Sequence, residues 1–332
     1  MSVVGSYARA SDTGRKRRRN EDSYVVAPPM FAVADGMGGA QAGEVASKLA
    51  AAALEETDPA TLSGPERLIS LIQEANRRVY ERSSSDPSTS GMGTTMTVAV
   101  VEDAGVTIGH VGDSRAYLVR EGKLEQLTED HSLVNELLKS GKLSPQEAEL
   151  HPQRSVITRA VGTDPDVDVD AFVVEAAEGD IFLLCSDGLT DMVGDDDILD
   201  TVERHREDLD RVTKALVSAA NRGGGEDNIT VIAFAIGAER DGDGDGDETV
   251  RMPSVDDPDA DTEEHVLPAP SVDTMVVPAA EVEDAFVEPG SPEAAALSRR
   301  KPISPAGRVR LVLTMLVLLA IAAVLLVVGL TR

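Results

Sequence analysis

Four apolar segments of this sequence meet an aspartate where they end or begin, and this recurrence constrains the fold more than any other feature. The segment FAVAD reaches Asp35, IGHVGD reaches Asp113, IFLLCSD reaches Asp187, and Asp227 directly precedes NITVIAFAI. Runs rich in Val and Ile that are bounded by Gly, Asp and Glu are typical of buried β-strands. The pattern therefore predicts several strands with carboxylates at their ends.

Carboxylates on neighbouring strand ends repel one another strongly unless a cation neutralises them. Ligand sets made only of oxygen favour Mg²⁺ or Mn²⁺ over Zn²⁺. Taken singly, an Asp before a Gly is more often an ordinary turn residue. The set of four nevertheless predicts a divalent metal site, and the glycines of DGMGG, residues 35–39, would let the backbone approach a metal or a substrate.

The rest of residues 1–238 has the pattern of antiparallel sheets covered by helices, rather than of repeated βαβ units. Helical periodicity is present at 43–56, 65–83 and 211–225, and the first of these would turn Val45, Leu49 and Ala52 inward. The predicted strands are YVVA, FAVAD, TTMTVAVVED, GVTIGHVGD, RAYLVREG, AFVVEA, DIFLLCSD and NITVIAFAIG.

The formal net charge of −28 argues against a nucleic-acid partner, because phosphate backbones are bound by Lys and Arg. Cys185 is the single cysteine, so no disulfide forms within the chain and a reducing compartment is expected. The first residues have no apolar run like that of a signal peptide. These observations predict a cytoplasmic globular part.

The C-terminal third has a different composition. Residues 239–298 contain 18 acidic and 2 basic residues, which predicts a disordered acidic linker. Residues 299–310 are a basic juxtamembrane segment, and 311–330 form an uncharged apolar run long enough for a transmembrane helix. A buried core helix is the less favoured alternative for that run. The positive-inside rule predicts a single-pass protein of the cell membrane with residues 1–238 in the cytoplasm.

Seven motifs follow one another along the predicted globular part: RRRNED at residues 17–22, ADGMGG at 34–39, GMGTT at 91–95, VGDSRAYL at 111–118, HPQRSVITRAVG at 151–162, CSDGLTD at 185–191 and GGEDNITVI at 224–232. In this order they resemble the metal-dependent protein phosphatases of the 2C type, the PPM family, and most of all its membrane-anchored bacterial serine/threonine phosphatases. The resemblance implies an α+β fold, an α/β/β/α sandwich of two mainly antiparallel sheets flanked by helix pairs, plus the C-terminal transmembrane helix.

The resemblance also implies roles for individual residues around two core ions, Mn²⁺ or Mg²⁺, with positions for a third. Asp35 would bridge the core ions, the Gly36 carbonyl would bind one of them, and Asp187 and Asp227 would complete the other. Glu21, with Asp22 as a second candidate, would act through metal-bound water, and Asp113 and Asp191 would hold the third ion. Arg17 would bind the substrate phosphate, although residues 15–19 could also be a solvated basic run.

Two side chains near this site limit the chemistry. Met37 stands where some family members carry a His that serves as a candidate general acid, and Met has no proton to donate. Cys185 lies in an apolar run and is expected to be a buried hydrophobe rather than a nucleophile. Residues 130–162 match the position of the family's flap, for which simple packing against the sheet is the alternative to a mobile element.

The leading hypothesis is a metal-dependent phosphatase that hydrolyses phosphoserine and phosphothreonine in proteins with a metal-activated water and without a phosphoenzyme. By family analogy its clients would be a bacterial membrane serine/threonine kinase and that kinase's substrates. A regulator of the anti-anti-sigma type is another possible client. The alternative from a different class is a catalytically inactive, membrane-tethered scaffold that binds phosphopeptides.

Overall fold

The computed structural model describes residues 3–38, 42–57, 62–102, 105–149, 151–237 and 275–276. Two antiparallel sheets form the centre of the described part. The first has the strand order β1(Val3–Asp12), β12(Ile229–Gly237), β11(Ile181–Cys185), β7(Arg115–Arg120), β8(Lys123–Gln126). The second has the order β10(Asp170–Val174), β6(Gly105–Val111), β5(Met96–Glu102), β3(Met30–Met37), β2(Asp22–Ala27), and the short β4(Gly93–Thr94) pairs with β3.

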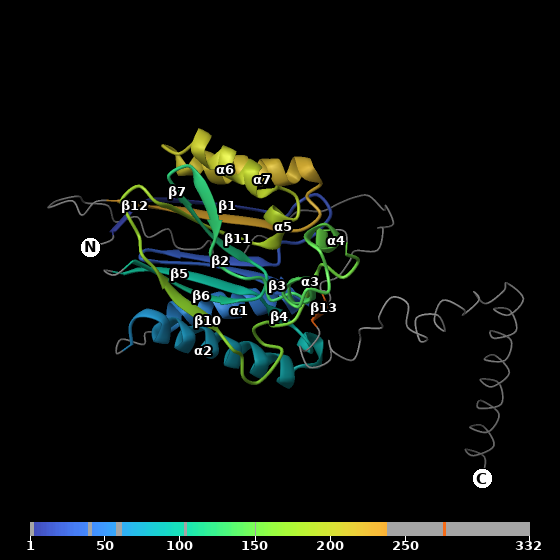
Figure 1. The fold of residues 1–332 in the computed structure, drawn as a ribbon. Helices are drawn as coiled ribbons and strands as arrows, with labels where there is room; N and C mark the ends of the chain where they lie inside the picture. Colours follow the sequence, from blue (N-terminus) through green and yellow to red (C-terminus); the bar gives the residue numbers. More distant parts are fainter. Residues whose placement is uncertain are drawn as a thin grey trace, which may run out of the picture. The chain divides into compact units, whose positions relative to one another are not determined.

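Helices cover the outer face of each sheet, so the elements form four layers (Figure 1). The helices α1(Ala42–Glu56) and α2(Gly64–Ser85) lie on the second sheet, and α6(Asp195–Arg204) and α7(Leu209–Gly223) lie on the first. Shorter helices occur as η1(Pro87–Thr89) after α2 and as α5(Asp187–Thr190) directly after β11. The predicted α+β sandwich with two antiparallel sheets is confirmed.

Three apolar clusters hold these layers together. Between the two sheets, Phe31 and Phe234 stack with ring centroids 4.3 Å apart, and the ring of Phe182 lies 5.2 Å from that of Phe234. The second cluster lies under α1 and α2, where the apolar face of α2 is fully buried: Leu68, Leu71, Ile72, Ala75 and Val79. The third lies under α6 and α7. Burial of these side chains stabilises the fold by roughly 1.5–3 kcal/mol for each large one.

The predicted inward face of α1 was wrong. Val45, Leu49 and Ala52 are only partly buried, whereas Ala46, Ala50 and Ala53 are fully buried. The helix contacts β3, β2 and α2 at once, and small side chains allow this close approach. Larger residues are therefore displaced to the rim of the contact.

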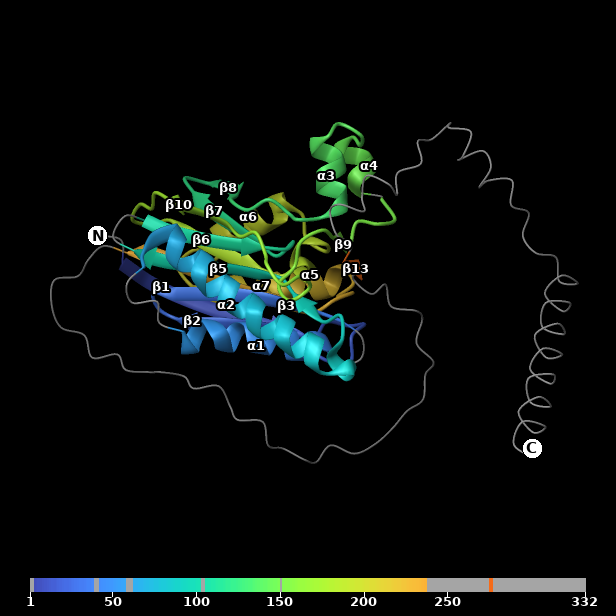
Figure 2. The same ribbon diagram turned by 90° about the horizontal axis from the view of Figure 1, so that it is seen from below.

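The flap is a helical hairpin that stands apart from the sandwich beside one end of the sheets (Figure 2). It contains α3(Leu133–Lys139) and α4(Pro145–Glu149), separated by Gly141 at φ +69°. Ser144 and Glu147 form a capping box, in which Ser144 N–H donates to Glu147 Oε2 at 2.9 Å and Glu147 N–H donates to Ser144 Oγ at 3.4 Å. The flap thus consists of one helix, a glycine turn and a second helix that begins at Pro145.

After the hairpin, β9(Val156–Ile157) returns the chain towards the sandwich and pairs in parallel with β13(Met275–Val276). The base of the flap is closed by a hydrogen bond from Thr158 N–H to the carbonyl oxygen of His131, at 2.9 Å. Movement of the hairpin stays a prediction.

The predicted basic segment 299–310 and apolar segment 311–330 lie outside the described residues, as does all of the predicted linker 239–298 except 275–276. Among the residues that the structure does describe, no helix has the length and apolar character needed to cross a membrane.

Candidate metal centre

Antiparallel topology brings the aspartates of the sequence motifs to one end of the sandwich. In each sheet neighbouring strands alternate in direction, so the end of β3 meets the start of β2, and the end of β11 meets the start of β12. Asp35 lies near the end of β3, Asp187 follows β11, Asp227 precedes β12, and Asp113 lies in the turn from β6 to β7. The predicted acids of both sheets therefore converge.

Asp22 and Asp35 form one half of this acid cluster, as opposite residues of the β2–β3 pair. Burial raises the pKa of Asp22 to about 6, even though Ser186 Oγ–H donates a hydrogen bond to its Oδ2 at 2.9 Å. Burial also raises the pKa of Asp35 well above its ordinary value, and the charges of Asp22, Asp187 and Asp227 add to the effect. Both carboxylates thus hold protons more tightly than exposed aspartates do.

Asp187 is the first residue of α5 and faces the same cluster. Its pKa is raised well above the ordinary value by burial and then by the charges of Asp113, Asp227 and Asp191. The Oδ1 atoms of Asp187 and Asp22 are buried and accept no hydrogen bond in the described structure. A buried carboxylate oxygen without a donor is unfavourable, and a cation would satisfy it.

Asp113 and Asp191 lie on the side of the cluster that faces the flap. Asp113 is 8 % exposed, and burial, followed by the charges of Asp130 and Asp191, raises its pKa to about 7. Asp191 caps the C-terminus of α5, and 39 % of its side chain is exposed. Its pKa is also raised, because partial burial outweighs the opposing charges of Arg154 and Arg115.

Gly36 sits where the backbone of β3 passes close to two other segments. Its N–H donates to the carbonyl oxygen of Glu21 at 3.2 Å. A Cβ added at Gly36 would lie 2.1 Å from the carbonyl oxygen of Gly43 and 2.6 Å from that of Glu21. The position therefore admits only glycine without a shift of backbone. Oε2 of Glu21 approaches the same spot, since a Cβ on Gly43 would meet it at 2.8 Å.

Arg17 reaches the cluster from the loop between β1 and β2. Its guanidinium donates to Asp227 Oδ2 at 2.7 Å, and 23 % of its side chain is exposed. The pKa of Arg17 is raised, because the attraction of Asp227, Asp35 and Glu21 exceeds the opposing effect of burial. Arg17 thus reaches the acid cluster from the basic run, and its role in binding phosphate stays a prediction.

Neutral side chains that sequence reasoning missed fix the acids in place. Asn228 is 3 % exposed; its Oδ1 accepts from Glu21 N–H at 2.7 Å, and its Nδ2 donates to the carbonyl oxygens of Thr13 and Arg19. Thr95 Oγ1 accepts from Asp35 N–H at 2.9 Å. Asn228 and Thr95 lie inside the sequence motifs. The sequence alone does not distinguish an amide or hydroxyl that supports the site from one that is exposed to solvent.

The two limiting side chains behave as expected. Met37 is 6 % exposed and packs against Ile157 and Ala160, so it fastens the base of the flap to β3. Cys185 is fully buried, and burial raises the pKa of its thiol to about 12. A thiol with that pKa is not a nucleophile at neutral pH.

The acid cluster is an open arrangement. Among the described residues, no three acidic, histidine or cysteine side chains are already placed as a shell around one ion. The donor set still fits hard cations, because it consists of oxygens, its pKa values are raised, and two of its buried oxygens have no donor.

Comparisons with known proteins agree with this geometry. The family model described as Protein phosphatase 2C matches residues 15–224. The chain belongs to the protein phosphatase 2C family. Membership makes it a protein phosphatase of a metal-dependent family, with the fold found here.

Named relatives and solved structures support the assignment. The chain is 42% identical over 233 residues to the serine/threonine phosphatase Stp of Listeria welshimeri, covering 67% of this chain and 92% of that protein. It is 40% identical to the serine/threonine protein phosphatase PstP of Mycobacterium tuberculosis over 70% of this chain and 45% of that protein. The crystal structure of the Mycobacterium tuberculosis phosphatase superimposes with a TM-score of 0.67 at 39% identity, over 71% of this chain and 100% of that one.

A further crystal structure, of the PstP catalytic domain in complex with two manganese ions, superimposes with a TM-score of 0.64 at 35% identity, over 72% of this chain and 100% of that one. The ions belong to that protein. The similarity of that manganese-bound structure to this chain is consistent with an acid cluster whose oxygen ligands suit hard cations.

Proposed function

We propose that this phosphatase hydrolyses phosphoserine and phosphothreonine in proteins, using divalent ions held by the acid cluster. The observation that carries the proposal is the convergence of carboxylates from both sheets on one end of the sandwich, with the guanidinium of Arg17 among them. Relatives at 40% and 42% identity are named serine/threonine phosphatases. A phosphate monoester dianion needs cations to approach so acidic a site.

The proposed ligands are those expected from the sequence. Asp35 and the Gly36 carbonyl, with Asp187 and Asp227, would hold two core ions, Mn²⁺ or Mg²⁺, while Asp113 and Asp191 would hold a third. Glu21 and Asp22 would orient water beside them. When bound, such ions neutralise the phosphoryl oxygens and make water a nucleophile at neutral pH.

Arg17 would bind the phosphoryl group of the substrate. Its guanidinium already lies at the acid cluster, 2.7 Å from Asp227 Oδ2, and a fork of donors matches two phosphate oxygens. Backbone contacts hold its loop, since Arg15 N–H donates to the carbonyl oxygen of Gly225 at 2.7 Å. Asn228 fixes Glu21, four residues after Arg17, by accepting a hydrogen bond from the Glu21 backbone N–H. Binding of phosphate by Arg17 thus requires little reordering.

Direct attack by water fits the side chains around the cluster. The Cys185 thiol is buried and protonated, so it does not form a phosphoenzyme. Water would add to phosphorus as the bond to the serine or threonine oxygen breaks. The leaving oxygen would take its proton from water at the site or from another group, because Met37 has none to give.

The inactive-scaffold alternative is not favoured. A phosphopeptide-binding module gains nothing from buried carboxylates that repel one another, and their burial destabilises the fold. The named relatives are phosphatases rather than adaptors.

We also propose that residues 311–330 anchor the protein in the cell membrane with its phosphatase part in the cytoplasm, and that a membrane serine/threonine kinase and its substrates are its clients. The apolar run and the basic residues before it support the anchor, and family analogy supports the clients. Membrane fractionation before and after deletion of 311–330 tests the first statement. Phosphoproteomics of a strain without the protein tests the second.

The decisive experiment for function is hydrolysis of a phosphothreonine peptide and of p-nitrophenyl phosphate by the purified full-length chain, in EDTA and in Mn²⁺ or Mg²⁺. We expect turnover only with metal, and its loss in Asp35→Asn and Asp187→Asn. A native protein that is folded and binds Mn²⁺ but hydrolyses neither compound would refute the proposal in favour of the scaffold.

A further inference from the structure

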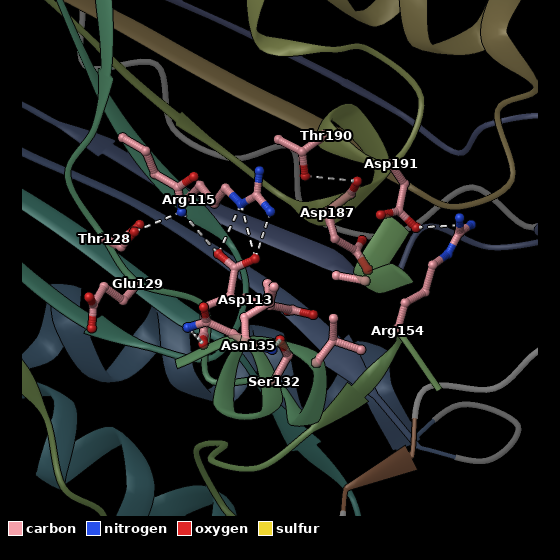
Figure 3. Close-up of a pocket in the computed structure, with 15 residues that line it drawn as sticks. Asp113, Arg115, Thr128, Glu129, Ser132, Asn135, Arg154, Asp187, Thr190 and Asp191 are labelled. Atoms are coloured by element: carbon pink, nitrogen blue, oxygen red, sulfur yellow. Dashed lines mark hydrogen bonds and ion pairs between the residues drawn. The ribbon is translucent and has the colours of Figure 1, made fainter. Parts of the chain in front are cut away.

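A pocket of about 650 Å³ opens between the acid cluster and the flap. Asp113, Asp187 and Asp191 line it on the side of the acid cluster, and Leu138 of α3 and Arg154 line it from the flap. Arg154 lies beside Asp191 (Figure 3). The pocket is therefore continuous with the proposed reaction site. A peptide whose phosphorylated residue lies at the acid cluster would place a neighbouring residue in it.

The charges of this pocket are strongly unequal. Its described lining contains five acidic residues, Asp113, Glu129, Asp130, Asp187 and Asp191, and two cations. One cation, Arg115, is committed to the fold: it donates to Asp130 from Nε and from a terminal nitrogen at 2.9 and 2.6 Å, and to the Tyr117 hydroxyl at 3.0 Å. The other is Arg154.

The guanidinium of Arg154 is held much less tightly than that of Arg115. Its side chain is 46% exposed, and its ion pair to Asp191 is 3.6 Å long, beyond hydrogen-bond distance (Figure 3). Asp191 is also a proposed metal ligand, and an ion bound there would compete with Arg154 for the same carboxylate. Arg154 would then face the pocket with its guanidinium available to a ligand.

Arg154 and Arg17 have one feature in common. Arg17 pairs with Asp227, and Arg154 pairs with Asp191. Each is a cation held against a proposed metal ligand. Arg17 is proposed to bind the phosphoryl group. Arg154, on the flap, can then bind another anion of the same substrate.

We propose that Arg154 binds an anionic group of the substrate chain in this pocket, next to the phosphorylated residue that is hydrolysed. The anion is a carboxylate of Asp or Glu or a second phosphate, because the planar guanidinium pairs with either in the same two-bond geometry. With so many acids in the wall, an anion elsewhere in the pocket would be repelled. The inference rests on the proposed function and adds a sequence preference to it: substrates with an acid near the phosphoresidue.

The test compares matched peptides. One phosphothreonine peptide has only neutral neighbours, and in a second set a single Glu replaces each neighbour in turn. The full-length chain with Mn²⁺ is assayed as the native protein, Arg154→Gln, Arg154→Lys and the control Arg82→Gln, since Arg82 is also half exposed and paired with one aspartate. The readout is the ratio of kcat/KM between acidic and neutral peptides. Both peptides meet the same metal centre, so an effect of the substitution on metal affinity cancels in this ratio.

We expect the native protein to prefer Glu at one or two positions by about fivefold, mainly through KM, as one partly exposed ion pair allows. Arg154→Gln should reduce that ratio to near one, Arg154→Lys should retain part of it, and Arg82→Gln should keep it whole. A hydrolysis-resistant phosphonate in place of the preferred Glu then shows whether a second phosphate is preferred to a carboxylate.

Binding of an acidic phosphonate peptide, measured by calorimetry, does not depend on turnover. A protein that hydrolyses no peptide, but binds the acidic one more weakly after Arg154→Gln, would refute the proposed function and leave this inference standing. A native ratio of one at every position, or a preference that survives Arg154→Gln, would overturn the inference while the phosphatase activity stands.

Discussion

Asp22 and Asp35 lie directly opposite each other on β2 and β3, so two carboxylates occupy one cross-strand pair. Like charges in that position destabilise a sheet, and burial strengthens the repulsion. Burial is the main cause of the raised pKa values of both residues, and at Asp35 the charge of Asp22 adds to it. The protein thus keeps an unfavourable pair at the centre of its proposed metal site, which has measurable consequences.

Asp35→Asn should stabilise the metal-free protein. The substitution removes a charge that burial and four neighbouring aspartates oppose, so we expect Tm in EDTA to rise by about 5 °C. Addition of Mn²⁺ should raise Tm of the native protein and change that of the variant little. Differential scanning fluorimetry provides both values, and a variant that melts below the native protein in EDTA would contradict the argument.

Arg17→Gln should separate substrate binding from metal binding. Loss of the guanidinium should lower kcat/KM for a phosphothreonine peptide about a hundredfold. Because Asp227 would lose its cation, Mn²⁺ affinity measured by calorimetry should increase. Arg18→Gln, a change in the adjacent exposed residue of the same basic run, is the matched control and should alter neither quantity. Equal losses in the two variants would mean that the run acts only through its overall charge.

Gly36→Ala should damage both stability and activity. The added methyl group would lie 2.1 Å from the carbonyl oxygen of Gly43, so β3 or α1 must move. We expect a loss of about 2–3 kcal/mol in the free energy of unfolding, read from urea denaturation. Gly194→Ala has open space around the new methyl group and should cost at most about 1 kcal/mol. Similar effects at the two positions would rule out the close backbone approach.

His110 should make the fold sensitive to acid. It is fully buried, with Nδ1 2.9 Å from Thr97 Oγ1 and Nε2 3.1 Å from the carbonyl oxygen of Glu129. Burial, with the charges of His131 and Arg159 also opposing protonation, lowers its pKa to about 3. Below the ordinary histidine pKa the unfolded chain therefore binds a proton that the folded chain does not, and stability falls as pH falls.

Between about pH 7 and about pH 5.5 this histidine should remove about 1 kcal/mol from the free energy of unfolding. Urea denaturation of the native protein and of His110→Gln at the two pH values measures it. The variant begins at lower stability, but its loss over the same step should be smaller by that amount. Parallel losses would show that His110 does not titrate between the two states.

Much of the fold follows from local patterns. All eight predicted strands are present, because each packs Val, Ile or Phe against one of the apolar clusters, although the residues of β10 are only partly buried or exposed. The strand β1 was missed, since Ala8 is its only buried residue and its place depends on backbone pairing with β12. The helix α6 was missed because its inward residues are few, mainly Ile198 and Val202, and its first turn is acidic. An acidic first turn is favourable beside a helix N-terminus, but it resembles a polar loop in the sequence.

The charged residues of the site were predicted from the sequence, whereas the neutral residues that hold them in place were not. Strand-end acids stand out because charge in an apolar context is unusual. Ser186 and Asn228 hold the cluster through hydrogen bonds that span more than 160 residues of sequence, and no local pattern marks such contacts. Arg154 was overlooked for the same reason, since only the folded flap places it near Asp191.

The order of strands in the first sheet also sets when the enzyme can become active during its own synthesis. The first strand of the described chain, β1, joins that sheet only through β12, which lies between β1 and β11. The loop that carries Arg17 follows β1, and Asp227 directly precedes β12. A chain emerging from the ribosome therefore cannot complete the proposed phosphate-binding side of its site until β12 has been made.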